Sequence, residues 1–195
     1  LICLVTGTIA AYAFSRFNFP GRTQLMLGYL VVRMFPAVLM IIPLFIVMRN
    51  IGLLDSSAGL AVAYTSFLLP LFVWMLKGFF DSAPKELESA ARIDGSTRIE
   101  AMFRIVIPIA RNGLVATCVF VAIAAWNEYL FALMLTTSTG SRTWPVGLQL
   151  MVGEFQLPWG MLAAGGIISI LPVIVLFAFV QRVMVAGITA GAVKG

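Results

Sequence analysis

Residues 81–108 read DSAPKELESAARIDGSTRIEAMFRIVIP and interrupt an otherwise strongly apolar chain. Around them, residues 77–113 carry 11 of the 21 charged side chains of the protein. A connection of this length is longer than most turns and is often functional. The polar segment therefore divides the chain into apolar parts that need apolar surroundings of their own.

Composition predicts a membrane protein. Of the 195 residues, 61% are hydrophobic and 11% are charged, and the mean hydropathy is +1.03. Soluble domains average about 45–50% apolar and about 25% charged residues, and disordered chains are less hydrophobic still. The net charge of +5 is spread over short segments between apolar runs, which argues against nucleic-acid binding.

Residues for metal or disulfide chemistry are scarce. The sequence has no histidine, and its two cysteines, Cys3 and Cys118, each lie in an apolar run. These features predict no metal site, no disulfide framework and no bound cofactor.

Five apolar segments predict an all-α polytopic membrane protein with a single domain, residues 1–195. The segments are 1–14, 25–48, 58–76, 114–135 and 161–180. The last four have 24, 19, 22 and 20 residues, enough for a helix to cross a hydrocarbon core of about 30 Å. The first is shorter and does not begin with methionine, so we expect a spanning helix whose start is missing in an N-terminally truncated domain.

The charges of the loops predict the orientation of the five segments. If the sides alternate, one side receives ten lysines and arginines, and the other receives only Arg49 and Arg142. Such a bias marks the cytoplasmic side. We therefore expect the chain to start outside, to cross the cytoplasmic membrane five times, and to end inside with residues 192–195.

The polar segment has the pattern of two short helices. Glu86 and Glu88 lie near the positive end of the first helix. Gly95 suits the left-handed residue that follows a helix, and Thr97 with Glu100 has the spacing of a capping box for the second. Glu86 and Glu88 lie on different helix faces, so they make a poor acid–base pair.

The first of these helices carries a small, mostly apolar stripe formed by Leu87, Ala90, Ala91 and Asp94. A helix this short cannot bury the stripe by itself. The stripe must pack either on the helix ends of the chain itself or on a partner protein, and both alternatives stay open.

Two ionisable side chains, Arg33 and Glu128, fall inside predicted spans. Such groups are costly in a membrane, usually face the protein interior and are candidates for a pathway. Glu128 belongs to the cluster Trp126-Asn127-Glu128-Tyr129, which offers the hydrogen-bonding groups and aromatic faces that a sugar needs. The alternatives are that Arg33 extends to the membrane interface and that the cluster makes hydrogen bonds between helices.

The polar segment resembles the cytoplasmic Glu-Ala-Ala loop of ATP-binding cassette importer permeases. That motif runs Glu-Ala-Ala, three residues, Gly, nine residues, Ile, one residue, Leu-Pro. The matching residues here are Ala90-Ala91, Gly95, Ile105 and Ile107-Pro108. Ser89 stands in the place of the motif glutamate, with Glu88 beside it, and Ile107 replaces the leucine.

Further blocks extend the resemblance over all 195 residues to the carbohydrate-type permeases, and most closely to the smaller permease subunit of maltose-like systems. These blocks are residues 11–16 with 19–21, residues 126–129, and the ending 187–195. The family usually has six spans. The resemblance therefore implies five spans here, with the first and part of the second missing.

The resemblance also implies a role and partners. Residues 85–95, within the loop 77–113, would form a coupling helix that docks on a separate cytoplasmic P-loop ATPase dimer, since this sequence has no P-loop motif. The coupling residues would be Glu86, Glu88, Ser89, Ala90, Ala91, Asp94 and Gly95. A second permease subunit and an extracytoplasmic solute-binding protein, which meets the outer loop 136–158, would complete a prokaryotic importer.

The implied activity is movement of a sugar or sugar-like solute by alternating access, with Arg33, Trp126, Asn127, Glu128 and Tyr129 as candidates for the pathway. Two other functions stay open. An ion-coupled secondary carrier would use Glu128 as a proton or ion site and would need no ATPase. A membrane-embedded enzyme would need a nucleophile–base pair or a metal cluster, and the sequence shows neither.

Overall fold

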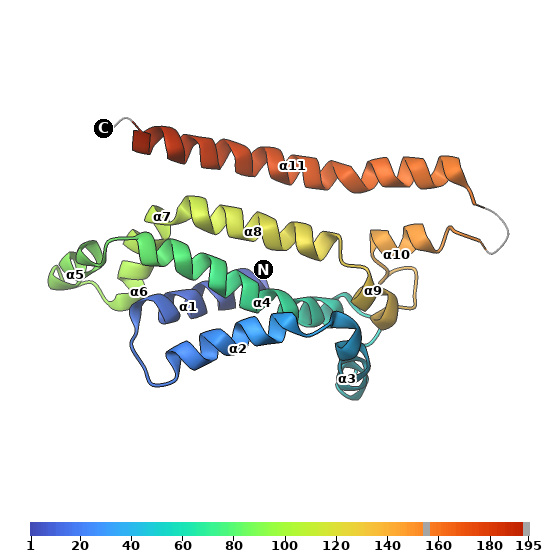
Figure 1. Cartoon of the computed structure of the whole chain (residues 1–195), viewed down its shortest axis with the longest axis horizontal. Coiled ribbons are helices and arrows are strands. Elements are labelled where there is room, and N and C mark those ends of the chain that lie inside the picture. The colour runs from blue at the N-terminus through green and yellow to red at the C-terminus, as the bar shows by residue number, and fades with distance from the viewer. Residues whose placement is uncertain (154–156, 193–195) are drawn as a thin grey trace.

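The computed structural model describes residues 1–153 and 157–192, with side chains up to Arg182. All regular elements in this part of the chain are helical, as predicted, and Figure 1 shows their arrangement. They are α1 (Ile2–Arg16), α2 (Arg22–Met34), α3 (Ala37–Asn50), α4 (Ser57–Ser82), α5 (Lys85–Ile93), α6 (Arg98–Ala101), the π-helix η1 (Met102–Val106), α7 (Ile107–Ile109), α8 (Arg111–Trp126), α9 (Leu130–Leu135), α10 (Trp144–Gln149) and α11 (Trp159–Ala192). The expected ending at 193–195 lies outside the described residues.

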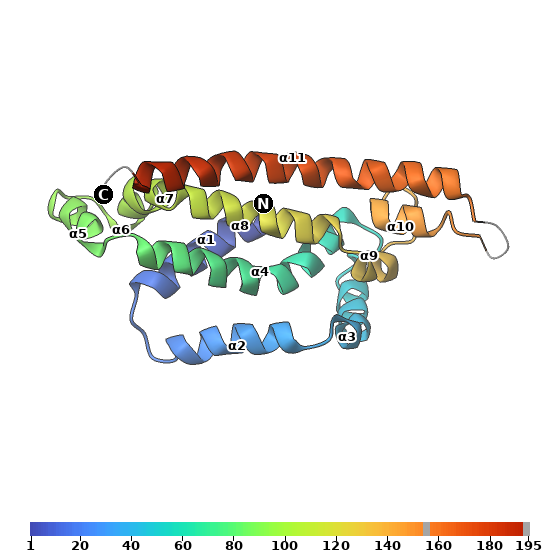
Figure 2. The same ribbon diagram turned by 45° about the horizontal axis from the view of Figure 1, so that its top comes forward.

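Helices α1, α4 and α8 form the centre of an elongated bundle. Figures 1 and 2 show α11 running along α8, and α2 lying beside α4. The main core joins buried side chains of α1 and α4 to those of the α6–α8 region. Its members are Ala11, Tyr12, Phe14, Phe72, Val73, Leu76, Phe80, Met102, Val106, Ala110 and Val121.

Helix α1 approaches α4 closely because Gly7 has no side chain. A Cβ atom at this position would overlap the ring of Phe72, which is 1% exposed. Gly78, on α4, has open space where its Cβ would lie. The Phe72 ring thus packs directly against the backbone of α1 at Gly7, and this close contact holds the two helices at a fixed separation.

The connections gather at two ends of the bundle. Helices α5, α6 and α7 lie at one end, which we call the basic end, and α3, α9 and α10 lie toward the other, the opposite end (Figure 1). Residues 17–21 are also at the basic end, whereas residues 51–56 and 136–143 are at the opposite one. This alternation agrees with the order of loops that the sequence predicts.

The predicted spans differ from the structure at two places. Segment 25–48 is not one helix, because α2 and α3 meet at 101° around Phe35 and Pro36. Proline lacks a backbone N–H and disfavours a helical residue before it, so the break falls there. Segment 114–135 is also broken, because α8 ends at Trp126 and α9 begins at Leu130.

Length and apolar composition single out α4 and α11 as helices that could each cross a membrane. Two bent pairs raise the number to as many as four. The second such pair is Arg98–Ile109 with Arg111–Trp126, bent by 81°. The expectation of five continuous spanning helices is therefore replaced by two to four candidate spans among the described residues, with α1 as a shorter apolar helix of 15 residues.

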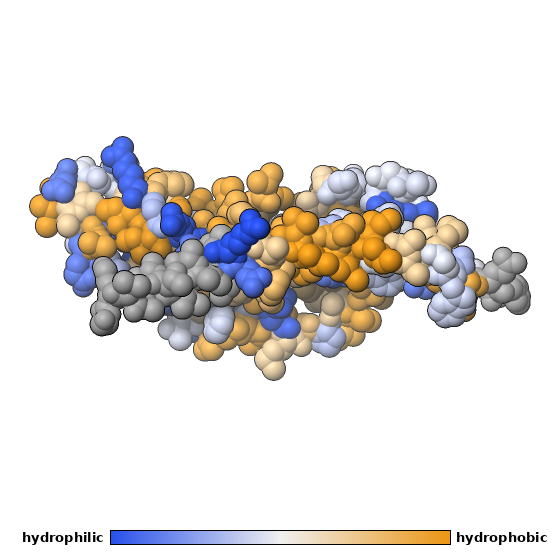
Figure 3. All heavy atoms as spheres, turned by 90° about the horizontal axis from the view of Figure 1, so that it is seen from above, coloured by the Kyte–Doolittle hydropathy of each residue, from blue (hydrophilic) through white to orange (hydrophobic). Residues whose placement is uncertain are grey.

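Helix α11 packs along α8 and also contacts α10. The indole Nε1 atoms of Trp126 and Trp144 donate hydrogen bonds to the carbonyl oxygens of Ser169 (3.1 Å) and Gly165 (3.2 Å). A Cβ at Gly165 would overlap Leu148 of α10, so glycine permits the approach. Most other side chains of α11, up to Arg182, are exposed and apolar. The face of the molecule seen in Figure 3 is largely apolar between its ends.

Replacing Gly7 by alanine should destabilise the fold, because the added methyl group overlaps Phe72 and overpacking costs about 1–3 kcal/mol. We expect a lower Tm for Gly7→Ala, measured by fluorescence-detected melting in mild detergent. Gly78→Ala is the matched control, and it should keep or slightly raise the Tm, since alanine favours a helix by about 1 kcal/mol. Equal melting of the two variants would contradict the close α1–α4 contact.

Candidate functional site

Helix α5 projects at the basic end with most of its side chains in solvent. Ile93 is 86% exposed and Leu87 is 47% exposed. The helix begins after Pro84 and is followed by Gly95, whose φ of +90° is the left-handed conformation that the sequence predicts. Because no atom lies within 4 Å of a Cβ built at Gly95, backbone conformation alone selects glycine there.

The predicted capping box at the start of α6 is present. The Glu100 carboxylate accepts from the Thr97 amide at 2.8 Å, and the Thr97 hydroxyl oxygen accepts from the Glu100 amide at 3.2 Å. These bonds to Thr97 lower the pKa of Glu100. The box fixes the direction in which the chain leaves the turn after α5.

The predicted stripe on α5 is open to solvent. Leu87, Ala90 and Asp94 are exposed, and Ala91 is half-buried. Of the two coverings that the sequence left open, packing on the helix ends of the chain itself is not seen among the described residues.

Glu88 and Ser89, adjacent on α5, point to different surroundings. Glu88 is 7% exposed, with one carboxylate oxygen accepting from the Tyr12 hydroxyl at 2.5 Å and the other 2.8 Å from Nε of Arg16. Ser89 is exposed, and its hydroxyl donates to the Lys85 carbonyl oxygen at 3.1 Å. The Glu88 carboxylate therefore faces the bundle, whereas the motif position, 89, carries an outward-facing serine hydroxyl.

Arg16 and its neighbour Ser15 connect α1 to the end of α4. A guanidinium N–H of Arg16 donates to the carbonyl oxygen of Ala83 at 3.0 Å, and the Ser15 hydroxyl donates to Asp81 at 2.7 Å. Lys77 forms an ion pair with the same Asp81. The polar groups at the basic end thus join α1, α4 and α5 into one network.

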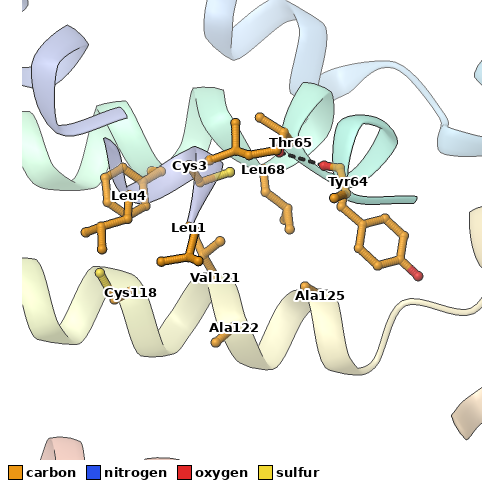
Figure 4. A pocket seen from close by; sticks show the side chains of 13 residues that line it. Leu1, Cys3, Leu4, Tyr64, Thr65, Leu68, Cys118, Val121, Ala122 and Ala125 are labelled. Carbon is orange, nitrogen blue, oxygen red and sulfur yellow. Dashed lines mark hydrogen bonds between the residues drawn. The ribbon is translucent and has the colours of Figure 1, made fainter. Parts of the chain in front are cut away.

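A cavity of about 500 Å³ lies between the first turn of α1, the first half of α4, and α8 (Figure 4). Tyr64 and Thr65 of α4 supply hydroxyl groups to a lining that is otherwise mostly apolar. The lining residues are Leu1, Ile2, Cys3, Leu4, Ala61, Tyr64, Thr65, Leu68, Phe72, Cys118, Val121, Ala122 and Ala125. None of the five predicted pathway residues is among them.

The cluster Trp126-Asn127-Glu128-Tyr129 lies at the break between α8 and α9. The Glu128 carboxylate accepts from the backbone N–H groups of Phe131 (2.9 Å) and Ala132 (3.2 Å), so it caps the start of α9. The Asn127 amide donates to the Ile123 carbonyl oxygen at 2.9 Å. Trp126 contacts α11 as described above, and the Tyr129 ring packs beside a small core cluster.

Arg33 lies in the last turn of α2 and is exposed. One of its guanidinium nitrogens is 3.5 Å from the carbonyl oxygen of Phe67 on α4. In the part of the chain that the structure describes, Arg33 makes no ion pair with Glu128. Arg33 and Glu128 nevertheless contact neighbouring parts of α4. The Tyr64 hydroxyl is 3.5 Å from the Glu128 carbonyl oxygen, and Tyr64 lies three positions before Phe67, less than one helical turn away.

Asp55 forms a second polar centre, at the opposite end, that sequence reasoning missed. Its carboxylate accepts from the amides of Thr137 (2.8 Å) and Ser138 (2.9 Å) and from the Ser141 hydroxyl, and its own amide donates to Leu135 (2.8 Å). We call these contacts the outer clasp. They lower the pKa of Asp55, with the Ser141 hydroxyl as the largest cause.

Sequence signals for these missed residues are faint. Asp55 is the acidic residue of a short loop and has a positive φ of 53°, a conformation that aspartate tolerates better than most residues. Tyr12 and Arg16 lie on an apolar helix, 76 and 72 positions before Glu88. Among the described residues, no group of three His, Cys, Asp or Glu side chains could hold a metal ion.

Comparison with known proteins identifies relatives along the whole chain. The family described as "Binding-protein-dependent transport system inner membrane component" matches residues 4–189. The trehalose transport system permease protein SugB of Mycobacterium tuberculosis is 42% identical over 197 aligned residues, which cover 100% of this chain and 72% of the relative.

Two other relatives extend the likeness. The sulfoquinovosyl glycerol transport system permease protein SmoH of Agrobacterium fabrum is 39% identical, covering 100% of this chain and 68% of its own length. The trehalose/maltose transport system permease protein MalG of Thermococcus litoralis is 38% identical, covering 100% of this chain and 72% of its own length.

Replacing Asp55 by alanine should loosen the outer clasp. Three donors lose their acceptor, and alanine tolerates the positive φ at this position less well than aspartate does. We expect trypsin to cleave after the exposed Arg142 several-fold faster in Asp55→Ala, followed by mass spectrometry of the fragments. Asp55→Asn keeps an acceptor and tolerates the backbone, so it should give an intermediate rate. Unchanged cleavage in both variants would show that the clasp does not hold this loop.

The outer clasp should not depend on pH in the neutral range. The folded pKa of Asp55 lies below the ordinary value of about 3.9. Its stabilising contribution is therefore present above that ordinary value and is lost only as the pH falls through the folded pKa. Hydrogen exchange at the Thr137 and Ser138 amides, corrected for intrinsic rates, should show constant protection from pH 8 to pH 5, and loss of protection within that interval would contradict the assignment.

Proposed function

From the premise that the chain belongs to the family of binding-protein-dependent transport system inner membrane components, we propose that it is one half of a transmembrane pair that imports a sugar or sugar-like solute by alternating access. Membership of the family makes the chain an inner-membrane permease component of an ATP-binding cassette importer and not a catalytic subunit. It also implies work with an ATPase and a solute-binding protein. Energy must therefore enter through a contact with another chain.

The observation that carries the proposal is that α5 has an exposed stripe and is attached to the bundle through another of its faces. Leu87, Ala90 and Asp94 of the stripe face solvent, as does Ile93 beside it, while Glu88 and its partners hold the helix at the basic end. A docked element transmits motion only if it is itself attached rigidly. We therefore assign α5 as the coupling helix for a P-loop ATPase dimer.

The two ends of the bundle receive different partners in this proposal. The basic end faces the cytoplasm, as the positive-inside bias supports, and the C-terminus lies on that side. The opposite end, with the outer clasp and the loop 136–158, meets an extracytoplasmic solute-binding protein. Helices α4 and α11, the two bent pairs and α1 together would account for five of the six spans expected of the family, in the cytoplasmic membrane of a prokaryote.

The solute class rests on the relatives and on the cavity. Three relatives are named for transport of trehalose, of trehalose and maltose, and of a sulfoquinovosyl glycerol. The cavity presents the hydroxyls of Tyr64 and Thr65 beside apolar walls, a combination that suits the polar and apolar faces of a sugar. Polar groups of Trp126, Asn127 and Glu128 have backbone partners, as do the Thr65 and Tyr64 hydroxyls, so what favours α4 over this cluster as the wall of the path is its position at the cavity.

The structure gives no support to the ion-coupled alternative. A proton or ion site at Glu128 needs a carboxylate free to bind its ligand. Both Glu128 oxygens instead accept from backbone N–H groups at the start of α9. Helix capping accounts for this acidic residue without any role in ion transport.

Replacing Ile93 by aspartate should weaken ATPase binding, because the variant places a charge in the most exposed apolar position of the coupling helix. Loss of a central interface contact costs about 2 kcal/mol, or about thirtyfold in affinity. The measurement is the amount of P-loop ATPase that co-purifies with the full-length tagged permease. Leu150→Asp, an equally drastic change at an exposed leucine of the opposite end, should retain it, and equal retention by both variants would refute the docking role.

Replacing Glu128 by glutamine tests the ion-coupled alternative directly. Glutamine still offers one acceptor to α9, so we expect a loss of about 1 kcal/mol in stability or less and continued ATP-driven uptake of trehalose or maltose in proteoliposomes. Abolished uptake in a complex that still assembles and hydrolyses ATP would instead favour a role for this carboxylate in transport.

A further inference from the structure

We infer that Glu88 is not a docking residue but the anchor that makes the coupling helix and α1 move as one body, so that motion of the ATPase reaches the cavity wall through α1. This inference rests on the proposed function and specifies how the coupling helix acts. We call Glu88, Arg16 and Tyr12 the Glu88 anchor.

The geometry of the anchor suits rigid attachment. One Glu88 oxygen accepts a hydrogen bond from the Tyr12 hydroxyl at 2.5 Å, and the other forms an ion pair with Arg16 Nε at 2.8 Å, without hydrogen-bond geometry. Both partners lie on the inward side of α1, one turn apart, so the carboxylate is held at two points along one helix. The side chains of Arg16 and Glu88 are 3% and 10% exposed, so little water is present to substitute for either contact.

Helix α5 joins α4 through Ala83 and Pro84 and joins α6 through residues 94–97. It also contacts α6 and η1. Glu88 is the only residue of α5 that is buried, and it is the side chain through which α5 is attached to α1. Arg16 adds to this attachment, because it also donates to the Ala83 carbonyl oxygen within the connection to α4.

The other end of α1 forms part of the cavity. Ile2, Cys3 and Leu4 line it, and Cys3 is separated from Arg16 by 13 residues, or about 20 Å of continuous helix. Gly7 and Phe72 fix α1 against α4 between these two ends. The opposite wall belongs to α8, with Cys118 and Ala122 (Figure 4). In this inference, displacing α5 acts through Glu88 on α1, and thereby on the part of the cavity wall that the first turn of α1 forms opposite α8.

The two cysteines provide a test that needs no knowledge of the solute. In the full-length importer, with Cys118→Ser and any other cysteines replaced, the reaction of Cys3 with N-ethylmaleimide is timed without nucleotide and after trapping with ATP and vanadate. We expect a several-fold difference between the two states. In Glu88→Ala, the ATPase should still co-purify and still be trapped, but the Cys3 rate should no longer respond to trapping.

Glu86→Ala is the matched control, because Glu86 lies on the same helix but is exposed. It should keep the full response. Tyr12→Phe is a milder variant that removes one contact while keeping the ring against Phe17 and Phe80, and it should reduce the response in part. Arg16→Ala should add to Glu88→Ala only the effect of losing its bond to the Ala83 carbonyl oxygen, since the rest of its effect acts through the shared pair.

The outcomes separate this inference from the proposed function. If the unchanged permease neither retains an ATPase nor responds to nucleotide, the proposed function fails and the inference fails with it. If the unchanged permease responds and both Glu88→Ala and Tyr12→Phe respond equally well, the anchor alone is refuted. Loss of ATPase binding in Tyr12→Phe as well as in Glu88→Ala would make this site part of the docking surface and would also overturn the inference.

Discussion

The buried ion pair between Arg16 and Glu88 is the constraint on which the basic end depends. It lies where a polar segment meets the apolar bundle, and each charge is tolerated there because the other is present. Removing one partner of a buried pair typically costs about 3–5 kcal/mol, since the remaining charge is left without water or a counter-charge. The same pair decides which face of α5 is turned inward, and thereby leaves the apolar stripe in solvent.

The local features of the polar segment could be predicted from the sequence, whereas its orientation could not. Thr97 with Glu100 and the left-handed Gly95 depend on residues a few positions apart, so their spacing was sufficient. The choice between Glu88 and Ser89 as the inward residue depends on Arg16, 72 positions away. The motif position, 89, holds an exposed serine, so the motif did not indicate the internal contact that Glu88 makes.

Hydropathy located the apolar segments but not their breaks. The hydropathy of an apolar run is the same whether its helix is straight or bent, so it did not predict the 101° turn at Pro36. The break before α9 had a signal that was interpreted differently. Glu128 is an acidic residue just before a short apolar helix, which is where a capping carboxylate belongs, and the structure places it there.

The attachment of α11 to the bundle bears on how its sequence can change in evolution. Both tryptophan indoles bind main-chain carbonyl oxygens, which every amino acid supplies. Position 169 is therefore free to drift among small and apolar residues without losing its bond to Trp126. Position 165 has less freedom, because a Cβ there would overlap the Leu148 side chain, which would have to shift. The bonds to the carbonyl oxygens thus impose no selection on residue identity at either site, whereas the packing against Leu148 favours a small residue at position 165.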